Sequence, residues 1–390
     1  MVIVLASGLI HGGNDTMTRK AAFVYSDKLS SFLLSESHPM KPIRLRHTYD
    51  LIQDYGVFDL PDASLVEARS VTDDEVLRFH KPEYLQCVKH IGDDDSYVDP
   101  AAFGFGPGDN PVSEGLYDAA ALSAGASVVA AELLVSGGFD RAFSIMGGLH
   151  HAMPGYASGF CVFNDPVLAI QELLARGLKV AYVDIDCHHG DGVQYAFYDT
   201  DAVLTISVHE SGSFLFPGTG FVAETGTGKG SGYSANVPLY PYTTDETYLW
   251  AFREAVPPLI EAFAPDVVVT QLGIDSHYRD PITHLGLTVQ GFASAVADLA
   301  GTAPKWLALG GGGYDMYAVA RAWTAAYAVM IDISLPDAIP DTYRDRHGVS
   351  TLSDHDDLSE FIPHQKDARQ YAEKSILELQ QQVFPVHGLR

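Results

Sequence analysis

The chain has 390 residues, of which 24 are Lys or Arg and 50 are Asp or Glu, so its formal net charge is −26. This surplus of acids disfavours general nucleic-acid binding, which needs a basic surface, and it suits a cationic substrate. The three cysteines, Cys87, Cys161 and Cys187, offer no disulfide framework and are typical of a reducing cytoplasm. The apolar stretch Met1–Ala6 lacks a basic segment, and no apolar stretch reaches ~20 residues, so we expect neither export nor a membrane span.

Apolar runs alternate with longer amphipathic stretches along the chain. The runs that predict buried parallel strands are Ala142–Met146, Val180–Val183, Val203–Val208, Val267–Leu272 and Trp306–Leu309. The stretches that predict helices are Tyr117–Val135, Pro166–Arg176 and Asp245–Phe263. This alternation indicates an α/β fold, in which ligands bind at the carboxyl ends of the strands.

No repeat or low-complexity linker divides the sequence, and its motifs are scattered from one end to the other. We therefore expect a single domain over residues 1–390. Its catalytic core would span about residues 20–330. The residues after about Ile333 are richer in Asp, Pro and Gln, and we expect a peripheral C-terminal extension over about residues 334–390.

Two adjacent histidines follow the first apolar run, in Gly147-Gly-Leu-His150-His151. A single histidine at such a place is more often a structural residue with satisfied hydrogen bonds. Adjacent histidines, with spare carboxylates elsewhere in the chain, favour a functional pair.

The next run ends in a dense polar cluster, Asp184–Gly192, with three acids, two histidines and two glycines. Buried charges are usually paired or bound to metal, and clustered acids cost several kcal/mol (roughly) unless a cation offsets their repulsion. On an extended strand, Asp184, Asp186 and His188 leave the same face. A polar loop facing water is the alternative, but His188 and Asp191 together favour a metal site.

A third ligand has to come from another segment, and Asp275 follows the run Val267–Leu272. Asp186, His188 and Asp275 would then offer two oxygens and one nitrogen. Catalytic zinc sites have this form, with three protein ligands and a fourth position open to water. Zn²⁺ tolerates this mixed set, although other divalent metals also fit it.

Four consecutive glycines, Gly310 to Gly313, precede Tyr314. Glycine allows close backbone approach to a ligand or a positive φ, although such a run alone is also typical of a flexible turn. A tyrosine hydroxyl placed after it is suited to donate to a developing oxyanion.

Together these motifs resemble those of the zinc-dependent histone deacetylase superfamily, which has the arginase/deacetylase fold. The matching pieces, in the family's order from about Ser26 to Tyr327, are His80-Lys-Pro-Glu-Tyr84, Gly147-Gly-Leu-His-His-Ala152, Gly159-Phe-Cys-Val-Phe-Asn-Asp165, Asp184 to Gly192, Phe216-Pro-Gly-Thr-Gly220 and Gly310 to Tyr314. The segments His38–Pro42 and Asp280–His284 look most like the class I branch and its bacterial acetoin-utilisation (AcuC-type) members. The resemblance implies a central, mostly parallel sheet of about eight strands, flanked by helices, with the active site at the carboxyl ends of the strands.

The activity implied by the resemblance is zinc-dependent hydrolysis of N6-acetyl-lysine, which releases acetate and free lysine. The implied ligands of one Zn²⁺ are Asp186, His188 and Asp275. His151, paired with Asp191, would be the general base and then the general acid. His150, paired with Asp184, would be mainly an electrostatic partner.

The resemblance also implies a narrow tunnel for the acyl-lysine side chain, in which Tyr314 would polarise the acyl carbonyl. The implied substrate contacts are Gly159, Phe160, Phe216, Ile282 and Gly312. Asp109 matches a rim acid that grips the substrate backbone, and Arg44 matches a basic residue near an internal acetate-release route.

Two positions depart from the family pattern. Ile282 stands where relatives usually carry Leu or Met, and Ile274 replaces a small residue, so both would alter acyl preference rather than the chemistry.

One or two structural potassium ions are implied as well. The first would be held by the side chains of Asp184 and Ser207 and by backbone carbonyls around Asp186, His188 and Val208. The second would lie near Phe197, Thr200, Val203 and Tyr233.

Several functions remain open on the sequence alone. The leading one is a lysine deacetylase acting on acetylated proteins or peptides, such as an acetylated metabolic enzyme. A hydrolase of acetylated polyamines or other small acylated amines would use the same catalytic set. A non-catalytic acyl-lysine-binding module conflicts with the complete set of catalytic residues, and an arginase-like dimanganese hydrolase would need a second set of carboxylate ligands. Cys161 or Cys187 could act as a nucleophile only with a dedicated base. The sequence leaves the oligomeric state open.

Overall fold

The computed structural model describes residues 4–5, 20–92 and 99–390, so most of the N-terminal run Met1–Ala6 lies outside the described residues. Eight parallel strands form the central sheet in the order β3-β2-β4-β9-β8-β5-β6-β7. The strands are β2 (Ala21–Tyr25), β3 (Ala63–Glu67), β4 (Arg141–Ser144), β5 (Val180–Asp184), β6 (Val203–Glu210), β7 (Ser234–Leu239), β8 (Val267–Gln271) and β9 (Lys305–Leu309). A separate antiparallel pair joins β1 (Val4–Leu5) to β10 (Ile333–Ser334).

The five predicted strands are present as β4, β5, β6, β8 and β9, which form the buried middle of the sheet. The prediction missed β2, β3 and β7. Strand β3 lies at one edge and alternates between buried and half-exposed residues, with Leu65 47% exposed, so it lacks a continuous apolar run. Strand β7 lies at the other edge and contains Pro238, which an edge strand tolerates because it has no neighbour on one side.

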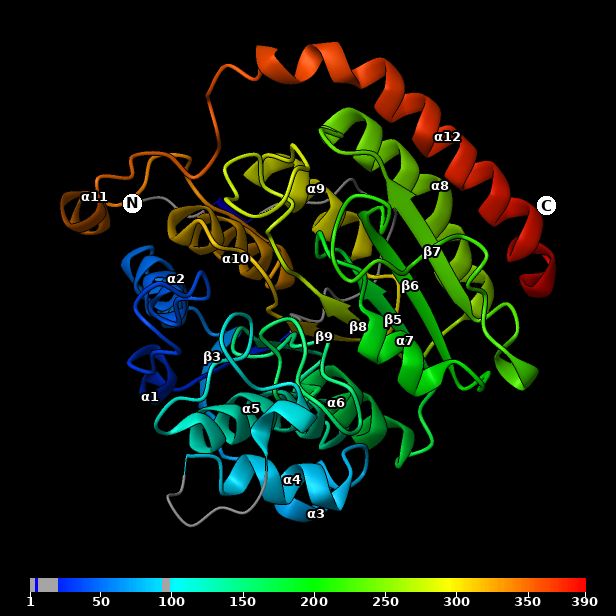
Figure 1. Ribbon diagram of the computed structural model, residues 1–390. Coiled ribbons are helices and arrows are strands. Elements are labelled where there is room, and N and C mark those ends of the chain that lie inside the picture. Colours follow the sequence, from blue (N-terminus) through cyan, green and yellow to red (C-terminus); the bar gives the residue numbers. More distant parts are fainter. Residues whose placement is uncertain (1–3, 6–19, 93–98) are drawn as a thin grey trace.

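Helices cover both faces of the sheet (Figure 1). The longer ones are α2 (Ile43–Asp54), α4 (Pro82–Lys89), α5 (Leu116–Val135), α6 (Asp165–Leu174), α8 (Asp245–Phe263), α9 (Val289–Leu299), α10 (Met316–Met330) and α12 (Gln365–Gln382); shorter ones are α1 (Asp27–Ser30), α3 (Asp73–Val76), α7 (Asp191–Phe197) and α11 (Asp341–His347). Helices α5 and α6 pack on one face, and α8, α9 and α10 pack on the other, with α2 against α10 and α12 against α8. The three predicted helices are confirmed as α5, α6 and α8.

Helix α5 is long and apolar enough to cross a membrane by length and composition, but 72% of its apolar window is buried inside the protein. It is therefore a core helix, and it also supports the site. The Ser123 hydroxyl donates to the carbonyl of Met146, and the Ser127 hydroxyl donates to Asp165 over 2.6 Å. Asp165 in turn accepts the N–H groups of Gly148 and Leu149, so these bonds fix the segment that follows β4.

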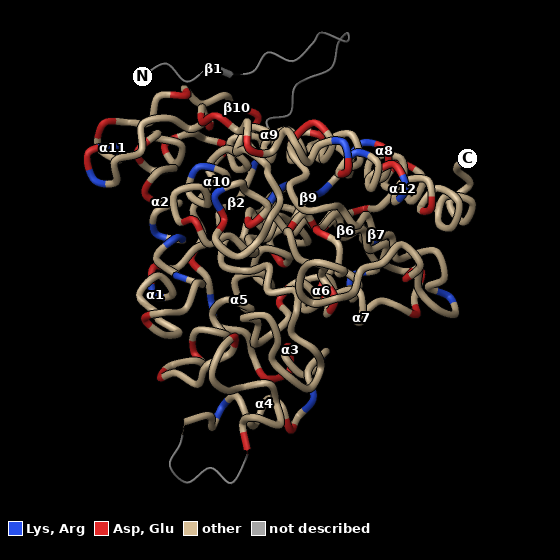
Figure 2. The backbone as a smooth tube through the Cα atoms, turned by 45° about the horizontal axis from the view of Figure 1, so that its top comes forward, with Lys and Arg blue, Asp and Glu red and all other residues tan. Residues whose placement is uncertain are grey.

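The residues after β10 run across the outside of the fold and lead into α12, which packs on α8 and β7 (Figure 1). The Ser375 hydroxyl donates to the carbonyl of Pro238 over 2.8 Å, so α12 is also bonded to the edge strand. The division into a core of about residues 20–330 and an extension of about residues 334–390 stays a prediction. Acidic residues are spread over the outer helices and loops, with basic residues interspersed (Figure 2).

Candidate metal-dependent active site

The sequence motifs meet at one edge of the sheet because the strands are parallel. Asp184, the last residue of β5, is level with Gln271 at the end of β8 and with Ser207 on β6. The segment after β9 lies beside the segment after β4, since Gly310 N–H donates to the carbonyl of Ser144. Chain segments that are more than a hundred residues apart in sequence therefore form one site.

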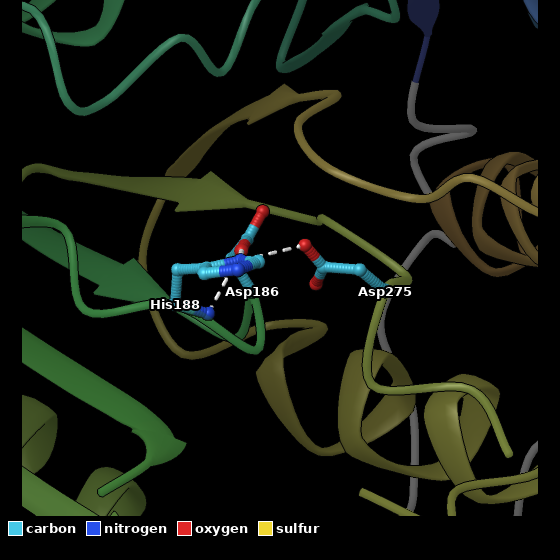
Figure 3. A group of neighbouring side chains, drawn as sticks. All are labelled: Asp186, His188 and Asp275. Atoms are coloured by element: carbon cyan, nitrogen blue, oxygen red, sulfur yellow. Dashed lines mark hydrogen bonds and ion pairs between the residues drawn. The ribbon is translucent and has the colours of Figure 1, made fainter. Parts of the chain in front are cut away.

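Asp186, His188 and Asp275 lie together at this edge, and all three are buried (Figure 3). His188 Nδ1 is 3.1 Å from Asp186 Oδ1 and 2.9 Å from Asp275 Oδ2. In a tetrahedral zinc site, ligand atoms at ~2.0–2.1 Å from the metal lie about 3.3 Å from one another. The three side chains therefore fit one metal ion with little movement.

Hydrogen bonds orient the metal-ligand candidates. Asp186 Oδ2 accepts from Gln271 Nε2 over 2.7 Å and from the N–H of Gly312 over 2.8 Å. Asp275 Oδ1 accepts from the N–H of Cys187 over 2.7 Å. Such outer contacts fix the direction of the free lone pairs. Gln271 was not among the predicted site residues, although an amide side chain at the end of an apolar strand was a usable signal.

The two buried carboxylates of this cluster, Asp186 and Asp275, favour binding of a cation. Burial and the charge of Asp186 raise the pKa of Asp275 to about 6. Burial opposes the charge on His188, but Asp275 and Asp186 outweigh it and raise the His188 pKa well above its usual range. Without metal the cluster holds protons, and a bound divalent cation takes over their charge.

The two histidines lie next to this cluster, and each is paired with its predicted carboxylate. His150 Nδ1 is 2.7 Å from Asp184 Oδ2, and His151 Nδ1 is 2.7 Å from Asp191 Oδ1. The two Nε2 atoms are 3.0 Å apart. One of the two rings must donate in this contact and the other must accept.

The surroundings decide which ring donates. Burial opposes the charge on His150, but Asp184 and Asp186 overcome it and raise its pKa to about 9. Burial and the neighbouring His150 charge lower the pKa of His151 to about 4. At neutral pH His150 is therefore a cation that donates from Nε2. His151 is neutral: its Nδ1–H donates to Asp191, and its Nε2, which accepts from His150 here, carries the lone pair that a general base requires.

The glycine run brings its backbone against the metal ligands. A Cβ on Gly312 would lie 2.1 Å from Asp275 Oδ2, so only glycine fits there. Arg44 is buried and donates to the carbonyls of Gly311 and Gly313, each over 2.7 Å, which holds the run in place. Burial and the charge of Asp275 raise the Tyr314 pKa well above its usual range, so its hydroxyl stays a donor.

A cavity of about 550 Å³ leads from the surface to this site. Its lining includes His151, His188 and Tyr314 together with the predicted substrate contacts Asp109, Gly159, Phe160, Phe216 and Ile282. Gly159 has φ +51°, and a Cβ there would lie 2.5 Å from the His151 ring and 2.9 Å from Phe216. The backbone of Gly159 therefore lies directly against the His151 ring, and a larger residue would not fit there.

Arg44 also borders a smaller apolar cavity of about 70 Å³ behind Phe160, with Met146 and Leu149 among its other lining residues. Arg44 therefore lies beside an internal cavity, as expected for a residue near an acetate-release route. That it takes part in acetate release stays a prediction.

The first predicted potassium set is brought together by the sheet. Asp184 and Ser207 are partners in the β5–β6 register, and Asp186, His188 and Val208 follow directly. Of the second set, Phe197 ends α7, Thr200 lies in the turn before β6 and Val203 starts that strand, while the N–H of Thr205 donates to the carbonyl of Tyr233. Both potassium sites stay predictions.

The cysteines near the site are poor nucleophiles. Burial raises the pKa of the Cys161 and Cys187 thiols well above the usual range. Neither has an imidazole base among its hydrogen-bond partners in the described part of the chain: Cys161 Sγ contacts the carbonyl of Gly159, and Cys187 Sγ contacts Glu210.

An eight-stranded parallel sheet with an Asp-His-Asp cluster and two carboxylate-paired histidines at its carboxyl edge defines a metal-dependent hydrolase. The histone deacetylase domain family matches residues 38–330. The chain belongs to this deacetylase family, in which zinc dependence is the norm.

Individual relatives agree with this assignment. The chain is 40% identical over 331 residues to the acetoin utilization protein AcuC of Bacillus subtilis, with 83% of this chain and 85% of that protein covered. It is 38% identical over 322 residues to AcuC of Staphylococcus aureus, covering 80% and 82%. The crystal structure of a histone deacetylase homologue from Aquifex aeolicus superposes with a TM-score of 0.80 at 30% identity, covering 90% of this chain and 100% of that chain. A homologue complexed with SAHA superposes with a TM-score of 0.81, also at 30% identity, covering 92% and 100%.

The site predicts the metal content of the purified protein. Wild-type protein should hold one zinc per chain in this cluster, and the double variant Asp186→Ala/Asp275→Ala should lose it, because only His188 remains as a ligand. Elemental analysis after dialysis measures this. Asp199→Ala removes an exposed acid and should leave the zinc content unchanged. Full zinc occupancy in the double variant would contradict the assignment.

Proposed function

We propose that the chain hydrolyses the amide bond of N6-acetyl-lysine in proteins or peptides, releasing acetate and free lysine. The observation that carries the proposal is the pair of carboxylate-bound histidines, His150 and His151, whose Nε2 atoms lie 3.0 Å apart beside a metal cluster at the inner end of a cavity of about 550 Å³. An amide is a poor electrophile and an amine is a poor leaving group. Its hydrolysis needs a base, an oxyanion donor and an acid in one place, and these residues supply all three.

The side chains act in sequence on the amide. Zinc, when bound, polarises the carbonyl and lowers the pKa of water toward about 7. His151 Nε2 accepts a proton as water attacks, while Asp191 keeps its ring in the required orientation. Tyr314 donates a hydrogen bond to the carbonyl oxygen as charge develops on it. His151 then passes its proton to the leaving nitrogen, and His150 balances the charge of Asp184 throughout.

The cavity lining favours an extended, unbranched chain with a polar group at its inner end. Gly159, Phe160 and Phe216 provide apolar walls suited to the four methylenes of lysine. At the rim the exposed Asp109 is held by its backbone, because its carbonyl lies 3.1 Å from His38 Nε2. A rim carboxylate on a fixed stretch of backbone is suited to accept hydrogen bonds from the backbone N–H groups of a peptide, which favours peptides over acetylated polyamines.

The proposal extends to the ions, the partners and the compartment. One zinc would be held by Asp186, His188 and Asp275, and one or two potassium ions would lie at the sets around Ser207 and Tyr233. The partners would be acetylated proteins, among them an acetylated metabolic enzyme, with no nucleic acid or membrane. Three buried free cysteines support a reducing compartment, which we take to be the cytoplasm.

A substrate panel tests the proposal. Zinc-loaded protein is assayed by acetate release on an acetyl-lysine peptide, on the matching peptides with longer acyl groups, and on acetylated polyamines. We expect the highest kcat/KM on an acetyl-lysine peptide, because the cavity fits the acetyl-lysine side chain and Asp109 accepts hydrogen bonds from the peptide backbone. A clear preference for acetylated polyamines would favour the small-amine alternative. Binding of acetyl-lysine peptide without acetate release would favour a non-catalytic module.

The oxyanion role of Tyr314 has a separate test. Tyr314→Phe deletes one hydroxyl and keeps the ring, so kcat should fall by roughly 10²–10³-fold, the usual loss for one oxyanion donor. KM should change much less, because the bond strengthens mainly in the transition state. Steady-state kinetics on an acetyl-lysine peptide separates the two constants. An unchanged kcat with a large rise in KM would make Tyr314 a binding residue only.

A further inference from the structure

The loop after the third metal-ligand candidate is tied to a residue from the far end of the chain. His277 lies two residues after Asp275, and its side chain is buried. Its Nδ1 accepts the N–H of Arg279 over 3.2 Å, so the ring proton sits on Nε2. From there it is donated to Asp354 Oδ2 over 2.9 Å.

The Asp354 side chain is 4% exposed, and both of its carboxylate oxygens accept from donors. Besides His277, Oδ2 accepts the N–H of Val289 at the start of α9 over 2.7 Å. Oδ1 pairs with Arg321 Nη1 of α10 over 2.7 Å. The backbone of Asp354 is fixed as well, since it exchanges two hydrogen bonds with the side chain of Gln290. One carboxylate therefore joins two helices to the active-site loop.

A second acid of the same segment reinforces this link. Asp356 forms an ion pair with Arg279 and accepts from the hydroxyl of Tyr278, both on the loop that carries His277. Residues 354–356 thus hold three consecutive loop residues. The segment lies beyond residue 330, where the match to the histone deacetylase domain ends.

The link continues from His277 to Tyr314. The His277 carbonyl accepts the N–H of Asp280 over 2.8 Å. The Asp280 carboxylate then accepts the N–H of Tyr314 over 2.8 Å and that of Ile282, in the tunnel wall, over 3.1 Å. A displaced His277 would therefore shift the residue that positions the Tyr314 backbone.

We propose that Asp354 is a positioning residue for the deacetylase reaction: by holding His277 it fixes the loop between Asp275 and Ile282 and so aims the Tyr314 hydroxyl. This inference rests on the proposed function, because it acts through Tyr314 as an oxyanion donor. It also gives the C-terminal segment a task in the reaction besides packing on the core.

Asp354→Asn tests the proposal with almost no change in shape. All three close partners of the carboxylate are donors, so an amide nitrogen must face a donor on one side. We expect kcat on an acetyl-lysine peptide to fall about 10- to 100-fold, since a displacement near 1 Å at a reacting group costs on that order. KM should change by less than about 3-fold, because the tunnel and rim stay in place.

A double-mutant cycle separates positioning from general structural damage. In a Tyr314→Phe background the hydroxyl is already absent, so Asp354→Asn should cost less than about 2-fold in kcat. Zinc content should stay at the wild-type level in all four proteins. Equal losses in both backgrounds, or a loss that follows zinc release, would overturn the proposal.

Two further variants guard the test. Asp245→Asn alters a half-buried carboxylate at the start of α8, which accepts from Thr288 at the cap of α9 but has no bond to His277, and its kcat should stay within about 2-fold of wild type. If Asp354→Asn fails to fold, His277→Phe replaces it, because the ring is kept while the Nε2 donor is lost and Asp354 retains Arg321. His277→Phe must show the same fall in kcat, and that fall must likewise shrink to less than about 2-fold in the Tyr314→Phe background. Wild-type turnover on the peptide is measured first, so a failed function is distinguished from a failed positioning role.

Discussion

The repulsion among buried carboxylates at the ends of neighbouring strands governs this site. Asp184, Asp186 and Asp275 are each 0–1% exposed, and the charge of Asp186 acts directly on Asp275. Leaving them unpaired would cost several kcal/mol (roughly) per ion. Their coexistence requires positive charge nearby, and the fold supplies it as the cationic His150 and as a place for a divalent metal. The chemistry uses the same charges that keep the site folded.

The difference between the two histidines follows from the same constraint. Asp184 is completely buried, and it accepts from Tyr182 as well as from His150, so it holds His150 charged. Asp191 begins α7, where it also accepts the N–H of Gly192, and one cation is already present beside His151. A second cation 3.0 Å from the first is unfavourable. Two adjacent and chemically identical residues therefore take different roles because His150 faces the charges of Asp184 and Asp186, whereas His151 is buried beside the charge of His150.

The sequence was informative at most places where a local pattern carried the signal, although the apolar run of β2 (Ala21–Tyr25) was missed. The apolar runs predicted the buried strands of the sheet, and the strand-end positions of Asp186, His188 and Asp275 predicted the metal cluster. The edge strands β3 and β7 were missed because one is half-exposed and the other contains a proline. Neither has the continuous apolar run by which buried strands are recognised.

Contacts between distant segments left no such local pattern. Asp354 stands in a polar stretch that resembles a solvated loop, and only the tertiary structure brings it to His277 and Arg321. The pairing of Asp280 with the backbone of Tyr314 is equally invisible along the chain. Sequence patterns therefore identify the residues that take part in the reaction. The residues that position them are identified only from the three-dimensional structure.

Acetate release as a function of added zinc tests the central claim most directly. The full chain is stripped of metal with a chelator, and turnover of an acetyl-lysine peptide is measured as zinc is returned in sub-stoichiometric steps. One catalytic metal at Asp186, His188 and Asp275 predicts a rate that rises linearly and levels off at one equivalent per chain. Full activity in the stripped protein, or a plateau only at two equivalents, would contradict the account.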